Sequence, residues 1–254
     1  MHRSAWPLPF WIAHRGAGKL APENTLAAFR EGAGLGYRAF ECDVKLSADG
    51  VPYLLHDATL DRCTCAQGSA AGWTWSALSR LDAGAWHSPD YAGEPPASLE
   101  AVSRFCRAKD LALNLELKPL PGQAHATGAT VARAVQGLWQ NAAAPVLLSS
   151  FEVAALEGAL SSAPLVPRAL LVDTLEGGWQ QALQALHCAA LIAHYPLVDA
   201  ELVAQVHAQQ RRVLVYTCND PEAAASLLAL GVDGIITDAL DRFTPTPEPT
   251  LQVR

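Results

Sequence analysis

The sequence lacks the long apolar run that a membrane-spanning helix requires. Half of its 254 residues are hydrophobic, yet no stretch approaches about 18 consecutive apolar residues. The first ten residues also lack the basic segment, apolar stretch and cleavage site of a secretory signal. We therefore expect a soluble protein of the cytoplasm, without stable membrane insertion.

Positive charge is scarce as well. The formal net charge is -7 and the pI is about 5.6, and Lys and Arg are scattered along the chain rather than clustered. Proteins that bind nucleic acid usually carry a basic patch that neutralises phosphates. We expect no nucleic-acid partner, and the sequence leaves the oligomeric state open.

Cysteine is present without the pattern of a disulfide framework. Six cysteines are spread over a chain that is long enough to bury an ordinary core, so we interpret them as reduced thiols. Cys63 and Cys65 are close in sequence, but no further Cys or His stands at metal-ligand spacing. A zinc site is therefore not expected.

What the chain does contain is a regular alternation of strand-like and helix-like segments. This pattern is typical of βα units that build a parallel sheet, and the length suits one large domain. Eight strands, the number of a (β/α)8 TIM barrel, are expected. They are Phe10 to His14, Ala39 to Lys45, Leu111 to Lys118, Val146 to Ser150, Arg168 to Val172, Leu191 to His194, Val213 to Tyr216 and Gly234 to Thr237.

Helix-start residues support the same α/β fold. We expect helices over Thr25 to Ala33, with Asn24 or Thr25 as the N-cap, over Leu99 to Ala108, and over Pro221 to Leu230. The barrel domain would span residues 1–243.

One interval and the tail depart from the βα rhythm. Residues 47–97 predict a small capping insertion after the second strand, which begins with a hairpin that turns at Asp49 and Gly50. Three tryptophans, Trp73, Trp75 and Trp86, are expected to fill the core of this insertion. Residues 244–254 are rich in Pro and Thr, and we expect an extended or disordered tail.

Acidic side chains gather at the expected C-terminal ends of two strands, where barrel enzymes carry their reacting groups. Alternation along a strand places Glu41 and Asp43 on one face of the second strand, and Glu116 shares a face of the third with Lys118. Carboxylate oxygens suit a hard cation, Mg²⁺ or Ca²⁺, better than zinc or copper. We predict that Glu41, Asp43 and Glu116 hold one divalent cation.

Two histidines lie close to these carboxylates in the expected fold. His14 ends the first strand and His56 closes the hairpin after the second. An imidazole, with a reference pKa of about 6.5, exists in both protonation states near neutrality. We predict that one histidine acts as general base and the other as general acid, and the sequence leaves open which does which.

Several short motifs, in this order, resemble the glycerophosphodiester phosphodiesterase family. The likeness covers nearly the whole chain, and the Leu81 to Trp86 segment resembles part of the family's small capping subdomain. The motifs are Ala13-His14-Arg15-Gly16, Pro22-Glu23-Asn24-Thr25, Glu41-Cys42-Asp43, His56-Asp57, Asn114-Leu115-Glu116-Leu117-Lys118 and Gly231-Val232-Asp233-Gly234-Ile235-Ile236-Thr237-Asp238.

The resemblance implies a TIM-barrel enzyme that hydrolyses small glycerophosphodiesters to sn-glycerol 3-phosphate and an alcohol. It also implies that the glycerol hydroxyl next to the ester can attack phosphorus, giving a cyclic phosphate that water opens. The implied site residues are the metal ligands Glu41, Asp43 and Glu116, the acid–base pair His14 and His56, and the substrate-binding residues Arg15, Lys118 and Tyr216.

The charges of this implied site balance. Three carboxylates and a phosphodiester carry four negative charges, which a divalent cation together with Arg15 and Lys118 would neutralise. One position departs from the family, which often has Trp-Thr-x-Asn where this chain has Tyr216-Thr217-Cys218-Asn219. We expect Tyr216 to line the pocket, and the choice of head group stays open.

Two alternatives remain at this stage. A lysophospholipase D acting on single-chain lipids would need an exposed apolar groove or a membrane-facing amphipathic segment. A catalytically silent barrel that only binds phosphodiesters would show a broken set of acid, base or metal residues. Glu23 and Asn24 either start a helix or support the site, and both interpretations stand.

Overall fold

Eight strands form a closed parallel barrel in the computed structural model, which describes residues 8–246 and 253. The strands are β1 Trp11–Ala13, β2 Ala39–Leu46, β4 Ala112–Leu117, β5 Val146–Ser150, β6 Arg168–Val172, β7 Ala190–His194, β8 Arg212–Tyr216 and β9 Gly234–Thr237. The barrel closes because β1 pairs with both β2 and β9. The predicted TIM barrel is confirmed, and every strand bound differs from its prediction by at most one residue.

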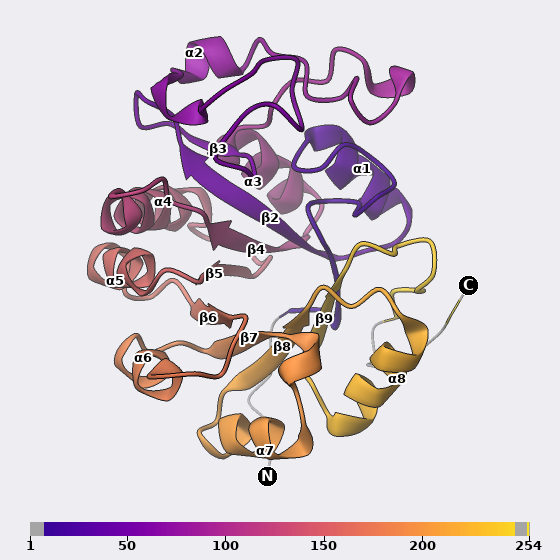
Figure 1. Cartoon of the computed structure of the whole chain (residues 1–254), viewed down its shortest axis with the longest axis vertical. Helices are drawn as coiled ribbons and strands as arrows, with labels where there is room; N and C mark the ends of the chain where they lie inside the picture. The colour runs from indigo at the N-terminus through magenta and orange to yellow at the C-terminus, as the bar shows by residue number, and fades with distance from the viewer. Residues whose placement is uncertain (1–7, 247–252, 254) are drawn as a thin grey trace.

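Helices surround the barrel on the outside, as Figure 1 shows. Each follows a strand in the order expected of βα units. They are α1 Leu26–Gly34, α3 Leu99–Ala108, α4 Ala124–Leu138, α5 Val153–Ser162, α6 Trp179–Ala185, α7 Ala200–Ala208 and α8 Pro221–Leu230. Within the described part of the chain, no helix is long and apolar enough to cross a bilayer.

Strand alternation divides the apolar core into two layers. The outward side chains of β2, among them Phe40 and Val44, pack in the large cluster between sheet and helices. Inward side chains such as Ala39 fill the barrel interior. Further along β2 the inward positions become Glu41 and Asp43, so the interior turns from apolar to acidic towards the C-terminal end of the barrel.

The N-cap of α1 is Thr25 rather than Asn24. Thr25 Oγ1 accepts a hydrogen bond from the Ala28 amide at 3.2 Å. Asn24 instead has a left-handed backbone, with φ 61°, and turns its side chain towards Asp43. Asn24 therefore supports Asp43 of β2, and the helix-cap interpretation holds for Thr25.

The insertion begins with the predicted hairpin. Strand β3, Pro52–Leu54, pairs antiparallel with β2, and the turn closes where the Gly50 amide donates to the Ser47 carbonyl. The insertion also contains α2 Trp75–Leu78 and the 3₁₀ turns η1 Ala70–Gly72 and η2 Pro89–Tyr91. Figure 1 shows the insertion running across the top of the view, with α2 near the end of β2.

A separate small core holds the insertion together. Tyr53, Leu60 and Leu78 are buried in it, and Trp73 and Trp75 pack against them. The prediction for Trp86 is wrong, because its side chain is 40% exposed and its indole NH donates to the Ala83 carbonyl. Of the predicted tail, residues 247–252 and 254 lie outside the described residues, and Phe243 forms an isolated bridge with Val253.

Candidate active site

Strand register brings three carboxylates together inside the barrel. Residues of β2 and β4 lie side by side, with Glu41 opposite Asn114 and Asp43 opposite Glu116. Because parallel neighbours in register point the same way, Glu41, Asp43 and Glu116 all face inward. One oxygen from each of the three lies within 4.8 Å of the others.

The acidic cluster has too few hydrogen-bond donors around it for all of its described oxygens. Among the described residues, the buried Glu41 Oε1 and Asp43 Oδ1 have no hydrogen-bond partner. Burial and the neighbouring Asp43 carboxylate raise the pKa of Glu41 to about 8. Burial and Asp43 also raise the pKa of Glu116. Buried carboxylate oxygens without donors fit a hard divalent cation, so the donor set suits the metal that the sequence predicts.

Two basic residues flank the carboxylates. Lys118 Nζ lies 2.8 Å from Glu116 Oε1 and 3.8 Å from Asp43 Oδ1. Arg15 Nε lies 3.3 Å from Asp43 Oδ2, and the Arg15 amide donates to Glu41. Burial opposes ionisation of Asp43, but the charges of Arg15, His56 and Lys118 outweigh it and lower the pKa of that carboxyl.

His14 lies between the cluster and the last barrel strand. Its Nδ1 is 2.6 Å from Asp238 Oδ1 and its Nε2 is 3.6 Å from Glu41 Oε2. Asn219 fixes Asp238, since its amide oxygen accepts from the Asp238 backbone at 2.7 Å. Burial would lower the pKa of His14, but the hydrogen bond with Asp238 and the charge of Glu41 raise it.

His56 is held by a network that crosses from the insertion to the barrel. Its Nδ1 lies 2.7 Å from Asp57 Oδ1, and Arg62 donates to both Asp57 oxygens at 2.7 and 3.0 Å. Arg62 also contacts both oxygens of Glu23, at 2.6 and 2.8 Å, and Glu23 accepts from Arg15 at 2.8 Å. Burial, together with the charge of Arg15, lowers the pKa of His56.

Tyr216 does not join the acidic cluster. Its ring lies 5.7 Å from the Phe151 ring and 5.7 Å from the His194 ring, and its hydroxyl donates to the Val172 carbonyl at 3.2 Å. The connection to the cluster runs through Phe151, whose ring centroid is 5.9 Å from Lys118 Nζ. Of the predicted site residues, Tyr216 thus makes no polar contact with the acidic cluster in the described part of the chain, although burial and, to a lesser extent, the negative charge of Glu116 raise its pKa.

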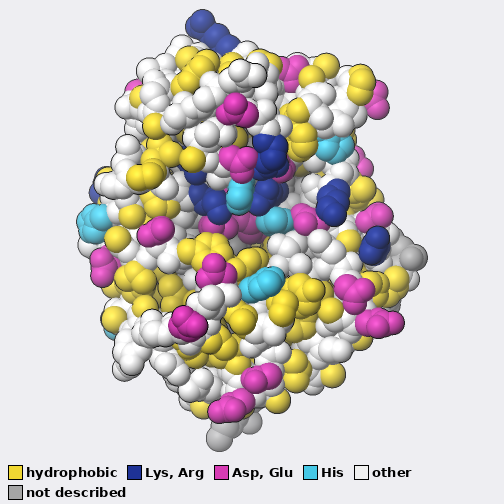
Figure 2. All heavy atoms as spheres, in the orientation of Figure 1, with side chains coloured by type: hydrophobic (Ala, Val, Ile, Leu, Met, Phe, Trp, Pro, Cys, Tyr) yellow, Lys and Arg dark blue, Asp and Glu magenta, His cyan; other side chains and the backbone are white. Residues whose placement is uncertain are grey.

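Figure 2 shows this arrangement on one face of the molecule. Basic, acidic and histidine side chains gather near the centre of the face, and apolar side chains lie directly beside them. Most of the site residues described above lie near the C-terminal ends of β1, β2 and β4. This is the end of a TIM barrel at which catalytic residues are found.

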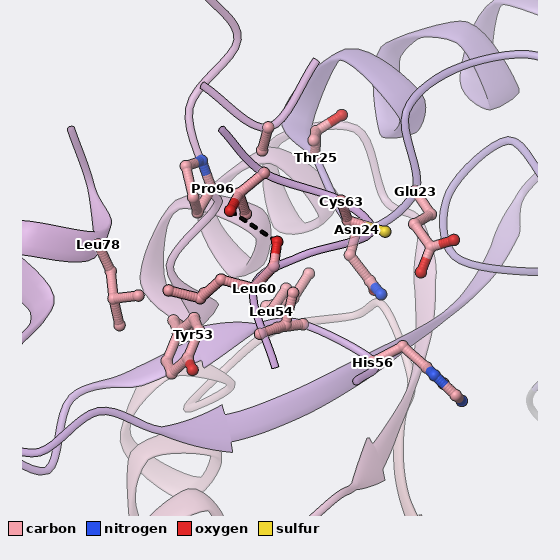
Figure 3. Close-up of a pocket in the computed structure, with 13 residues that line it drawn as sticks. Glu23, Asn24, Thr25, Tyr53, Leu54, His56, Leu60, Cys63, Leu78 and Pro96 are labelled. Carbon is pink, nitrogen blue, oxygen red and sulfur yellow. Dashed lines mark hydrogen bonds between the residues drawn. The ribbon is translucent and has the colours of Figure 1, made fainter. Parts of the chain in front are cut away.

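A narrow cavity separates the insertion from the barrel, and Figure 3 shows its lining. The polar side chains of Glu23, Asn24 and His56 lie towards one end, and the apolar Leu78 lies at the other. Its free volume is about 10 Å³, the space of about one water molecule. The cavity is therefore too small for a diester substrate.

Three site residues were missed in the sequence. Asp238 and Asn219 follow β9 and β8, and their position after strand ends is a signal that could have identified them. Arg62 gives no such signal, because it lies in the irregular insertion and meets its partners only through the tertiary fold.

Comparison with known proteins agrees with this geometry. The sequence model of the glycerophosphoryl diester phosphodiesterase family matches residues 14–242. A glycerophosphodiester phosphodiesterase of Caldanaerobacter subterraneus is 32% identical over 232 residues, which cover 89% of this chain and 93% of that protein.

Solved structures show the same similarity. A phosphodiesterase of Oleispira antarctica, determined in complex with the product sn-glycerol-3-phosphate, has a TM-score of 0.87 and 35% identity, covering 91% of this chain and 94% of that one. A glycerophosphodiester phosphodiesterase of Agrobacterium tumefaciens has a TM-score of 0.78 and 27% identity, covering 92% and 98%.

Proposed function

Since the chain belongs to the glycerophosphoryl diester phosphodiesterase family and is a glycerophosphodiester phosphodiesterase, we propose that it works with a divalent cation and two histidines. The products would be sn-glycerol 3-phosphate and an alcohol. One observation carries the proposal: three inward carboxylates lie with oxygens within 4.8 Å of one another, and Arg15 and Lys118 flank them.

Glu41, Asp43 and Glu116 would hold the cation, which is Mg²⁺ or Ca²⁺. When bound, the ion would polarise the phosphoryl oxygens and offset the charge that builds on them. Arg15 and Lys118 would bind the phosphate and keep it in contact with the site. Without these positive groups the anionic cluster would repel an anionic diester, at a cost on the order of 3 kcal/mol per pair of charges about 5 Å apart at an effective dielectric of 20.

His14 and His56 would move the protons of the reaction. Asp238 and Asp57 contact the two Nδ1 atoms, an arrangement that favours the tautomer with a proton on Nδ1 and leaves each Nε2 for the substrate. One imidazole would take the proton of the attacking hydroxyl as the new P–O bond forms. The other would give a proton to the departing alcohol oxygen as its P–O bond breaks.

The nucleophile is proposed to be the glycerol hydroxyl beside the ester. Its attack would release the alcohol and leave a cyclic glycerol phosphate. Water would then open this ring, with the two histidines exchanging their roles as acid and base. Phosphorus keeps its oxidation state in both steps, one P–O bond forming as another breaks, so no redox partner is needed.

We further propose a cytoplasmic location. All six cysteines, each within the described residues, are free thiols, which suits a reducing compartment. Cell fractionation with markers for cytoplasm, membrane and exterior tests this location directly.

The reaction is tested with a panel of substrates. Glycerophosphocholine, glycerophosphoethanolamine, glycerophosphoinositol and a lysophosphatidylcholine are each incubated with the protein, and glycerol 3-phosphate and lysophosphatidate are quantified by mass spectrometry. We expect glycerol 3-phosphate from the diesters. His14→Ala and His56→Ala are expected to lower its release by at least about a hundredfold. Release of lysophosphatidate alone would favour the lysophospholipase D hypothesis. Full activity of either variant would refute the assigned histidine roles.

A further inference from the structure

Three basic residues line a cavity on the outside of the barrel, at the end of the strands opposite the acidic cluster. Arg30 lies on α1, Arg38 directly precedes β2, and Lys109 directly follows α3. The cavity has a volume of about 380 Å³ and lies between α1 and α3, which Figure 1 shows as neighbours. We call this cavity with its three basic residues the basic groove. Extended chain leads from Arg38 to Asp43, so the two backbone positions lie about 16 Å apart.

The basic groove contains no carboxylate. Its other lining residues are Ala33, Gly34, Phe105 and Leu111. Within the described residues, none of the three cations forms an ion pair with Asp or Glu. Elsewhere in the same residues, ion pairs with carboxylates are made by Arg15, Arg62, Arg104, Lys118 and Arg212. In a chain with a net charge of -7, this cavity is therefore locally positive.

The acidic residues that are closest along the chain face other surroundings. Asp110 lines a neighbouring cavity instead of this one. Glu100 pairs with Arg104 at 2.5 Å. Burial first, and then the charge of Glu31, raise the pKa of Tyr91, which places Glu31 towards the insertion. The three positive charges of the basic groove thus have no neighbouring side chain that neutralises them.

Two of the three cations are held beside the cavity. Arg38 Nη2 donates to the Asp110 carbonyl at 3.1 Å, and the other nitrogens of this guanidinium have no partner among the described residues. Lys109 Nζ lies 5.7 Å from the centre of the Phe105 ring. Phe105 and Leu111 add apolar surface to the same lining. The basic groove therefore offers free N–H donors beside a small apolar surface.

We propose that the basic groove binds a small phosphomonoester dianion, whose organic part lies against Phe105 and Leu111. Guanidinium groups donate in pairs to phosphate oxygens, and an ammonium group adds a compact positive charge. Three cations around one cavity repel one another, and a dianion between them turns this repulsion into attraction. The site is separate from the acidic cluster and does not depend on the proposed function.

Amide shifts in NMR locate the binding of a defined probe. Phenyl phosphate is titrated into the ¹⁵N-labelled chain in the presence of Mg²⁺, and the shifts of Gly34 and Leu111 report the basic groove. The shifts of Gly16 and Lys118 report the acidic cluster, where a phosphate is also expected to bind. We expect saturable shifts at Gly34 and Leu111. Raising NaCl from about 0.05 M to about 0.5 M should weaken this binding at least about tenfold, because both partners are exposed to solvent.

Substitutions of single cations test which residues bind the probe. Arg38→Gln and Lys109→Gln are each expected to raise the dissociation constant at the basic groove about five- to tenfold. Arg107→Gln is the matched control, because it removes an equal charge from an exposed position on α3 outside the cavity lining. It should change the constant by less than about twofold. Thermal melts show whether each variant folds, and the salt series on the wild-type chain needs no variant.

Several results would overturn the proposal. They are shifts confined to the acidic cluster, an affinity that salt leaves unchanged, and an equal loss in Arg107→Gln. Saturable shifts with phenol, which lacks the phosphate, would show that the ring alone is bound. Binding to vesicles that contain phosphatidic acid, without any response to phenyl phosphate, would show a membrane surface instead of a small-molecule site. None of these measurements uses turnover, so the basic groove and the proposed phosphodiesterase reaction can fail independently.

Discussion

His14 Nδ1 lies 2.6 Å from Asp238 Oδ1, although 224 positions separate the two residues. The contact exists because β1 and β9 pair where the barrel closes, with Ala13 opposite Thr237. One proposed proton-transfer residue is thus oriented by the residue that follows the last strand, and its position depends on closure of the whole fold.

Asp238→Asn is expected to lower kcat/KM by about a hundredfold, because the amide cannot hold the imidazole as the carboxylate does. Losing the carboxylate also removes the Asp238 contribution that, with the charge of Glu41, raises the pKa of His14, so the limb of the pH–rate profile that His14 sets should move to lower pH. Steady-state rates between pH 5 and pH 10 measure both effects.

The control for this variant is Asp233→Asn. Asp233 Oδ2 lies 2.6 Å from His207 Nε2, a similar pair located on α7 and before β9, away from the acidic cluster. It is expected to change stability and leave the pH–rate profile in place. An unshifted profile in Asp238→Asn would contradict the assigned role.

Arg62→Met is expected to lower kcat/KM by roughly tenfold to a hundredfold, since Arg62 holds both Asp57 and Glu23. Removing its positive charge favours the protonated imidazole, so the limb set by His56 should move to higher pH. Arg104→Met is the control, because Arg104 forms an exposed pair with Glu100 on α3. Equal profiles for the two variants would show that Arg62 is a surface residue without influence on the site.

Glu23 gives a prediction for stability against pH. Burial opposes its ionisation, but the hydrogen bonds from Arg62 and the charge of Arg15 lower its pKa below 4.5. A carboxyl whose pKa falls on folding stabilises the protein above its unfolded pKa, and this contribution is lost as the pH falls through the folded pKa. Glu23→Gln should therefore cost about 1.5 kcal/mol at pH 7 and less at pH 3.5.

Urea unfolding at the two pH values measures this difference. In the Arg62→Met background, Glu23→Gln should lower the free energy of unfolding by less than it does in the wild-type chain, because the two residues act as a pair. A cost that stays the same at pH 3.5 as at pH 7 would argue against the ion-pair account.

Gly18 packs directly beneath the residue that orients His14. A Cβ at this position would lie 2.1 Å from the Asp238 carbonyl oxygen, and the backbone has φ +57°. Gly18→Ala is expected to destabilise the fold by about 2 kcal/mol or more and to displace Asp238, with a loss of activity. Gly34→Ala in α1 has open space around its Cβ and should retain activity and stability. Equal melting temperatures for the two variants would contradict the packing argument.

The barrel and the acidic cluster were predictable because both follow from local pattern. Fully buried parallel strands are short apolar runs, and the polar residues that end them face a common mouth. Alternation along β2 was enough to place Glu41 and Asp43 together, and the same rule placed Glu116 beside them.

The remaining features depend on the tertiary fold of irregular segments. Asn is a residue type that favours N-cap positions. The left-handed backbone of Asn24 instead turns its side chain towards Asp43, and helix-start rules do not predict this contact. No sequence pattern marks Arg62 as a site residue, because its contact with Glu23 forms only when the insertion folds. Tyr216 ends a strand as expected, but its packing against the Phe151 ring depends on the loop that follows β5, which strand alternation does not predict.

The most direct test of the account is the release of glycerol 3-phosphate from glycerophosphocholine by protein stripped with chelator, measured against added Mg²⁺ or Ca²⁺. We predict no release without a divalent ion and saturable recovery with one of them. In Glu41→Gln the recovery should need a far higher concentration of ion. Undiminished release by the metal-free protein would contradict the central claim that Glu41, Asp43 and Glu116 form a catalytic cation site.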